Sequence, residues 1–128
     1  MPKIGSMQTR SKYYVATLPW SIWEAVIDHA AEAQEDNPTA WVERMLVAAA
    51  KKPSMSWKRD KPYVPARARR GSNKRIRLGP EAKAALKMGV RELGGSVTHA
   101  IQVLYFTGLQ DYAYKRLREH VASYAPKS

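Results

Sequence analysis

Two stretches of this sequence share one pattern: KYYVATLP at residues 12–19 and NKRIRLGP at residues 73–80. Each alternates like a short strand and ends in a proline. Each is followed by a segment with the spacing of an amphipathic helix, a turn, and a second apolar helix. The leucines Leu18 and Leu78 lie sixty residues apart. The order strand, helix, helix is therefore written twice, and one copy is too small to bury a core of its own.

The starts of the helices carry recognisable signals. Pro19 and Pro80 suit the first turn of a helix, where the missing N–H costs nothing. The second helix of each repeat follows a capping residue, Asn37 or Ser96. A capped start is an ordinary structural device, but its backbone N–H groups can also bind a DNA phosphate. The candidates for such a phosphate contact are Asn37, Thr39, Ser96 and Thr98.

These patterns predict the organisation of the whole chain. A flexible N-terminus (1–10) precedes repeat one (11–52), and a basic, proline-rich linker (53–72) leads to repeat two (73–109). We predict a mainly α fold with a two-stranded antiparallel β-ribbon, in which both repeats share one core as a single domain. The strands pair either within one chain, as in a monomer, or between chains, as in a swapped dimer.

A further helix is expected in the C-terminal segment, residues 110–128. The apolar helix of repeat two is predicted over residues 97–109, and Gly108 marks its end. Helical spacing then resumes from Gln110 to Tyr124. This additional helix either caps the core or presents its tyrosines, Tyr112, Tyr114 and Tyr124, to a partner.

The charge of the chain is strongly positive and unevenly distributed. Lys and Arg number 22 against 11 Asp and Glu, and most of the excess lies within residues 51–77. Such an excess favours polyanionic partners, nucleic acid first and an anionic membrane second. The linker is therefore either a solvated connector or a contact to phosphate. The candidate phosphate ligands in this region are Lys58, Arg59, Lys61, Arg67, Arg69, Arg70 and Lys74.

Signals of catalysis, metal binding and membrane insertion are missing from the sequence. There is no cysteine, which excludes disulfides and thiolate metal sites, and His29, His99 and His120 have no metal-site spacing. No run of 18 apolar residues and no signal peptide is present. We expect a cytoplasmic protein that is not an enzyme, binds no metal or cofactor, and does not associate with a membrane.

Alternation along the strands assigns their side chains to two faces. In the second stretch Ile76 and Leu78 share an apolar face, whereas Asn73, Arg75 and Arg77 share the other. Arg and Asn are the side chains that read guanine and adenine edges bidentately in the major groove. In the first stretch, the face opposite the inward residues consists of Tyr13, Val15 and Thr17.

The layout of strand, Leu-Pro, helix, turn and helix resembles the ribbon-helix-helix family of DNA-binding proteins. In that family two strands form an antiparallel ribbon that enters the major groove, with alternate side chains facing the bases. The resemblance implies these base-facing residues: Tyr13, Val15, Thr17, Asn73, Arg75 and Arg77. Repeat one departs from the usual polar pattern, so it touches either thymine methyls or the sugar–phosphate backbone. Unequal halves imply a non-palindromic site.

The double repeat and the stretch YVATLPW at residues 14–20 are also similar to single-chain members of the family that assist DNA transfer from bacterial tumour-inducing plasmids. This resemblance implies a monomeric, bacterial protein that binds double-stranded DNA at the overdrive enhancer beside a transfer-DNA border. A ParA-like ATPase and a relaxase are the implied partners in promoting single-strand transfer. A transcriptional or partition repressor of the same fold, or an antitoxin-like adaptor that binds a partner through residues 110–124, remains an alternative.

Overall fold

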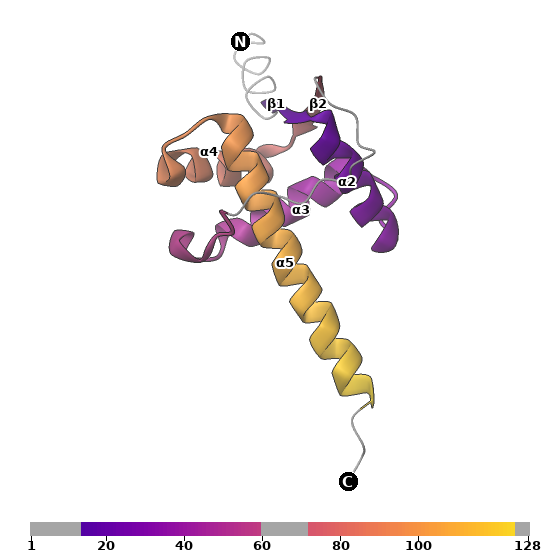
Figure 1. Ribbon diagram of the computed structural model, residues 1–128. Helices are drawn as coiled ribbons and strands as arrows, with labels where there is room; N and C mark the ends of the chain where they lie inside the picture. The colour runs from indigo at the N-terminus through magenta and orange to yellow at the C-terminus, as the bar shows by residue number, and fades with distance from the viewer. Residues whose placement is uncertain (1–13, 60–71, 125–128) are drawn as a thin grey trace, which may run out of the picture.

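The computed structural model describes residues 14–59 and 72–124 (Figure 1). In this part of the chain the protein is mainly helical, with one two-stranded antiparallel sheet and four α-helices. The elements follow in the order β1 (Tyr14–Pro19), α2 (Trp20–Glu32), α3 (Pro38–Ala50), the 3-10 turn η1 (Ser54–Ser56), β2 (Asn73–Leu78), α4 (Pro80–Leu93) and α5 (Val97–Tyr124).

The two strands pair with each other within the chain. Ala16 lies opposite Ile76 at the middle of the ladder, and Tyr14 lies opposite Leu78 at one end. The inner row of the ribbon is buried at Ala16, Leu18, Ile76 and Leu78. One face of the ribbon therefore packs on the helices and the other is directed away from them (Figure 1).

A single hydrophobic cluster joins the ribbon to the helices. Its centre is the crossing of α3 and α5, where Trp41, Leu46, Leu104 and Tyr105 are fully buried. The helices α2 and α4 contribute their apolar stripes to the same cluster, and the cluster includes residues from both repeats. Burial of these side chains is the main driving force for holding the ribbon on its helices.

Helix α5 corrects the prediction of a break at Gly108. It runs without interruption from Val97 to Tyr124, so no separate helix begins at Gln110. A Cβ atom at Gly108 would lie 2.8 Å from the Cα atom of Met45 and closer still to its carbonyl group. Glycine is required here because the backbones of α3 and α5 approach closely, and its weak helix propensity does not end the helix.

The first part of the predicted linker is attached to the core. Trp57 is buried, and its Nε1–H donates to the carbonyl oxygen of Ala49 at 2.9 Å. The backbone N–H of Lys58 donates to Thr107 Oγ1 at 2.7 Å. Of the two alternatives for the linker, residues 53–58 therefore do not form a solvated connector, because the Trp57 indole anchors this basic segment in the core.

A chain of hydrogen bonds runs through the core between three helices. Trp41 Nε1–H donates to the Tyr105 hydroxyl at 3.0 Å, and this hydroxyl lies 2.8 Å from His29 Nδ1. The Tyr105 hydroxyl can donate its proton to His29 only if Nδ1 of the imidazole is unprotonated and acts as the acceptor. Burial lowers the pKa of His29, against the opposing effect of nearby carboxylates, and burial also raises the pKa of Tyr105.

The position of His29 predicts that acid destabilises the fold. An unfolded chain protonates this imidazole near pH 6.5, whereas the folded protein holds its pKa lower. Between these two values the unfolded state binds more protons, so the free energy of unfolding falls as the pH falls. Thermal melts between about pH 7.5 and pH 5 should show this decrease, with full stability above the ordinary histidine value.

The His29→Asn variant should flatten that pH dependence, because an amide oxygen can accept from Tyr105 without titrating. The exposed His99→Asn serves as the matched control and should keep the slope of the unaltered protein. If His29→Asn melts with the same pH dependence as the unaltered protein, another group is responsible.

Candidate nucleic-acid interface

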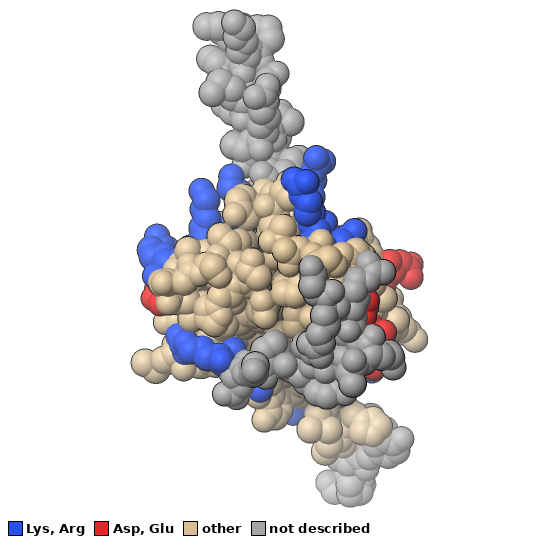
Figure 2. All heavy atoms as spheres, turned by 45° about the horizontal axis from the view of Figure 1, so that its top comes forward, with Lys and Arg blue, Asp and Glu red and all other residues tan. Residues whose placement is uncertain are grey.

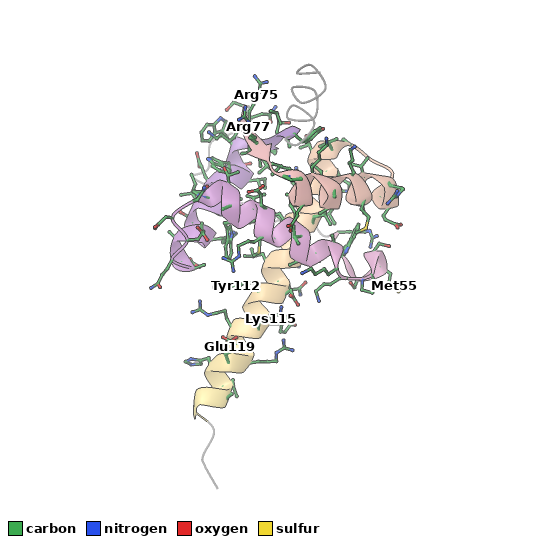
Figure 3. All side chains as sticks on the ribbon, turned by 180° about the vertical axis from the view of Figure 1, so that it is seen from behind. Met55, Arg75, Arg77, Tyr112, Lys115 and Glu119 are labelled. Carbon is green, nitrogen blue, oxygen red and sulfur yellow. The ribbon has the colours of Figure 1, made fainter. Side chains whose placement is uncertain are left out.

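The outer face of the ribbon brings most of the predicted base-facing residues together. Across the ladder Val15 lies opposite Arg77, Thr17 opposite Arg75, and Pro19 opposite Asn73. The three side chains of β2 are exposed, Val15 is 48% exposed, and Thr17 is partly exposed. Figure 3 shows Arg75 and Arg77 at the end of the molecule opposite to the C-terminal half of α5. Tyr13 lies outside the described residues.

This row combines two kinds of side chain that suit the edges of base pairs. An Arg guanidinium can donate two parallel hydrogen bonds to guanine, and an Asn amide can pair with adenine. The methyl groups of Val15 and Thr17 can contact the methyl group of thymine. Because each arginine has an apolar or hydroxyl side chain directly opposite, the two strands present different chemistry to the same groove.

Lys74 lies on the inner row of the ribbon, opposite Leu18. Its ammonium group lies 5.8 Å from the ring centroid of Trp20 and 5.4 Å from that of Trp23. These cation–π contacts hold the partly buried lysine over the first turn of α2. Any phosphate contact by Lys74 would therefore be made at the flank of the ribbon rather than on its outer face.

The start of α3 confirms the predicted cap but suits a phosphate poorly. Asn37 Oδ1 accepts from the backbone N–H of Thr39 at 3.0 Å and from that of Ala40 at 3.2 Å. Pro38 at the first helical position has no N–H to offer. The carboxylates of Glu35 and Asp36 directly precede the cap. The Asn37 side chain therefore already occupies the backbone N–H groups that a phosphate would need. The two neighbouring carboxylates would also repel an anion at this helix start.

The start of α5 is a more favourable place for a phosphate. Ser96 Oγ accepts from the backbone N–H of His99 at 3.1 Å, as predicted for a cap, and Thr98 lies in the same turn, partly buried. Val97, the first residue of the helix, lines a shallow hollow together with Lys83 and Lys87. Two cations therefore lie near the positive end of the α5 helix dipole.

Two of the predicted phosphate ligands of the linker, Lys58 and Arg59, lie away from the ribbon. Lys58 and Arg59 follow the η1 turn, which packs at the C-terminal end of α3. Figure 3 shows Met55 of this turn on the opposite side of the helices from Arg75 and Arg77. The remaining candidates lie outside the described residues: Lys61, Arg67, Arg69 and Arg70.

Sequence reasoning missed a row of cations on α4. Its stripe was interpreted as core alone, but Lys83, Lys87 and Arg91 recur at every fourth residue beside that stripe. The available signal was this spacing on a helix that directly follows the arginine-bearing strand. Figure 2 shows basic side chains over the ribbon and, together with some acidic ones, on the α4 side, and it shows acidic side chains on the α2 side.

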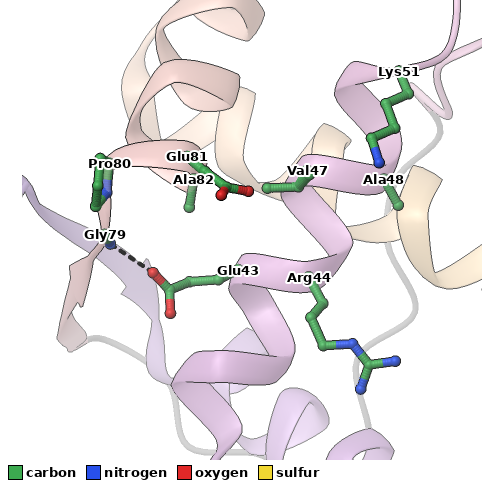
Figure 4. A pocket seen from close by; sticks show the side chains of 9 residues that line it. All are labelled: Glu43, Arg44, Val47, Ala48, Lys51, Gly79, Pro80, Glu81 and Ala82. Atoms are coloured by element: carbon green, nitrogen blue, oxygen red, sulfur yellow. Dashed lines mark hydrogen bonds between the residues drawn. The ribbon is translucent and has the colours of Figure 1, made fainter.

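A shallow hollow between α3 and the β2–α4 junction has a structural role (Figure 4). Glu43 crosses from α3 and accepts a hydrogen bond from the backbone N–H of Gly79 at 2.5 Å. Cations and carboxylates both line this hollow, among them Arg44, Lys51 and Glu81. The buried end of β2 is thereby fixed to α3, which sets the position of the ribbon on the helices.

No family model, no curated protein and no solved structure matches this chain. Among the residues that the structure describes, no helix has the length and apolar character needed to cross a membrane. The same residues contain no cluster of three or more His, Asp or Glu side chains that could hold a metal ion.

Proposed function

We propose that this protein binds double-stranded DNA sequence-selectively, through a ribbon supplied by two ribbon-helix-helix repeats fused in one chain as a pseudo-dimer. The exposed row Asn73, Arg75 and Arg77 carries the proposal, because it lies on a two-stranded ribbon whose other face is buried. A ribbon of this width fits the major groove of B-form DNA. The net charge of +11 supplies attraction to the phosphates.

The repetition of the elements supports the pseudo-dimer. A shift of sixty residues maps α2 (Trp20–Glu32) onto α4 (Pro80–Leu93), and it maps the start of α3 onto that of α5 within one residue. The same shift relates Ala16 to Ile76, the pair at the middle of the ladder. Two equivalent strands paired about a twofold axis would meet in this way.

For the biological role, we propose an accessory protein of conjugative DNA transfer that acts without enzymatic activity of its own. It would bind the overdrive enhancer beside a transfer-DNA border in the bacterial cytoplasm, together with a ParA-like ATPase and a relaxase. The support is the resemblance of residues 14–20 and of the fused double repeat to the single-chain members of the family that assist DNA transfer. A repressor of the same fold would bind beside its own promoter instead of a transfer origin.

The first test is binding to labelled duplexes, followed by fluorescence anisotropy at about 150 mM salt. A transfer-enhancer sequence is compared with a scrambled control, and the mass of the protein is measured in parallel by light scattering. Selective binding by a monomer is expected, with a log–log salt slope of about −5 if roughly six phosphates are neutralised. Equal and weak binding to both duplexes would contradict sequence-selective recognition.

A second candidate function, an adaptor that binds a partner protein, is favoured by one observation. The C-terminal half of α5 extends beyond the other helices (Figure 1), and residues 113–122 are exposed. Tyr114, Leu117 and Val121 lie on this extension with more than half of their surface exposed. Exposed apolar side chains on a projecting helix are typical of a protein-binding surface.

Removal of residues 113–128 tests this adaptor function. The melting temperature and the DNA affinity should stay close to those of the full chain, because the exposed residues 113–122 contribute little to the core. Transfer activity in the cell should be lost if the extension binds a partner. The full-length double variant Leu117→Ser and Val121→Ser should reproduce that loss. A truncated protein that no longer binds DNA would show that the extension supports the ribbon.

A further inference from the structure

The two flanks of the ribbon differ in charge although the elements repeat. The shift of sixty residues places Lys83, Lys87 and Arg91 of α4 at the positions of Trp23, Ile27 and Ala31 of α2. Lys87 and Arg91 are exposed, as are Ile27 and Ala31. One flank therefore presents a row of cations where the other presents uncharged side chains.

The row on α4 borders the ribbon. Lys83 and Lys87 line a hollow of about 200 Å³ together with Tyr14, the first residue of β1, and Val97, the first residue of α5. If the ribbon lies in the major groove of DNA, the sugar–phosphate backbone beside that groove would run within reach of these long side chains. Figure 2 shows basic side chains continuing from the ribbon onto this side of the molecule.

The flank formed by α2 is acidic. Glu24, Asp28 and Glu32 occupy the neighbouring row of that helix, and Glu35 and Asp36 lie in the loop that follows it. Figure 2 shows acidic side chains on this side. Lys74 is a cation at this flank, held over Trp20 and Trp23. Carboxylates within a Debye length, about 8 Å at physiological salt, would weaken the attraction of a phosphate there.

We infer that Lys83, Lys87 and Arg91 form a phosphate-binding row for one backbone of the duplex, so that the protein holds the two flanks of its DNA site unequally and binds in one orientation. The inference rests on the proposed binding of DNA by the ribbon. It assigns to α4 a role that does not depend on reading bases. The row adds affinity on any sequence, whereas the direction of binding follows from the difference between the flanks.

The row is tested with a duplex in which single phosphates are replaced by uncharged methylphosphonates. In the unaltered protein, the replacements that weaken binding should cluster on one flank of the site. The double variant Lys87→Gln and Arg91→Gln should lose that sensitivity, and its salt slope should shrink by about two. Its affinity should fall by the same factor on specific and scrambled duplexes.

The second flank provides a gain-of-function control that misfolding cannot imitate. The variant Ile27→Lys and Ala31→Arg places cations at the equivalent exposed positions of α2. It should bind more tightly, with a salt slope steeper by about two and a new set of sensitive phosphates on the other flank. Thermal melts of both double variants confirm that the fold is retained.

Two results would overturn the inference. One is equal sensitivity to methylphosphonates on both flanks in the unaltered protein, and the other is an unchanged salt slope in the α4 variant. Failure of the proposed DNA binding gives a different result, since the unaltered protein would then bind no duplex selectively and no phosphate replacement would matter.

Discussion

Replacement of Arg75 or Arg77 by alanine is expected to weaken binding to the correct DNA site by on the order of 1–3 kcal/mol each. The loss on unrelated duplexes should be much smaller. Both side chains are exposed on the outer row of β2, next to Asn73. In the proposed complex each guanidinium makes two hydrogen bonds to a guanine, and alanine would leave those base acceptors without partners.

The conservative replacement by lysine separates base reading from phosphate binding. Lysine keeps the positive charge but lacks the planar fork that donates two parallel hydrogen bonds. Arg77→Lys should therefore lose most of the selectivity while keeping most of the affinity for random DNA, as measured by anisotropy on matched duplexes. Equal losses on specific and scrambled duplexes in the alanine variants would show that the arginines hold phosphates and do not read the sequence.

The substitution with the largest expected effect on stability is Gly108→Ala. A methyl group at this position would overlap the backbone of Met45. That backbone cannot move away, because α3 is held in the core before and after Met45 by its own buried side chains Trp41, Leu46 and Ala49. We expect the free energy of unfolding to fall by about 2–3 kcal/mol, in the range of overpacked cores. Chemical denaturation measures this loss directly.

The sign of the stability change in Gly108→Ala shows whether α3 and α5 are in close contact. In an isolated helix, alanine in place of glycine stabilises by about 1 kcal/mol, so a crossing without close contact would give a more stable protein. The control is Gly95→Ala, where the new atom would meet His99 Cδ2 at an ordinary 3.4 Å. That variant should be close to neutral. A stable Gly108→Ala protein would mean that α3 and α5 are further apart than described.

Much of the ribbon and its helices was predictable because the signals are local. Alternation along the second stretch separates Ile76 and Leu78 from Arg75 and Arg77, and the structure has the same two faces. The prolines mark the strand–helix junctions, and Asn37 and Ser96 cap the helices that follow them. The helical spacing runs from Trp20 to Gln34, whereas α2 stops at Glu32 and Gln34 turns the chain with a φ of 60°.

The features that sequence reasoning missed depend on what another part of the chain places beside a residue. Gly108 carries the same local signal whether it ends a helix or allows a crossing, and only the backbone of Met45 decides between them. Trp57 lies in a basic, proline-rich segment, yet a buried carbonyl on α3 accepts its N–H. Lys87 looks like any solvated lysine until the hollow beside Tyr14 places it at the ribbon.

The sequence by itself determined the repeated order of strand and helices, the two faces of the ribbon and the capped helix starts, because periodicity and capping act over a few neighbouring residues. The tertiary structure alone decided the continuity of α5, the attachment of residues 53–58 and the position of the α4 lysines beside the ribbon. These depend on close approaches between segments far apart in the chain, whose packing no local pattern encodes.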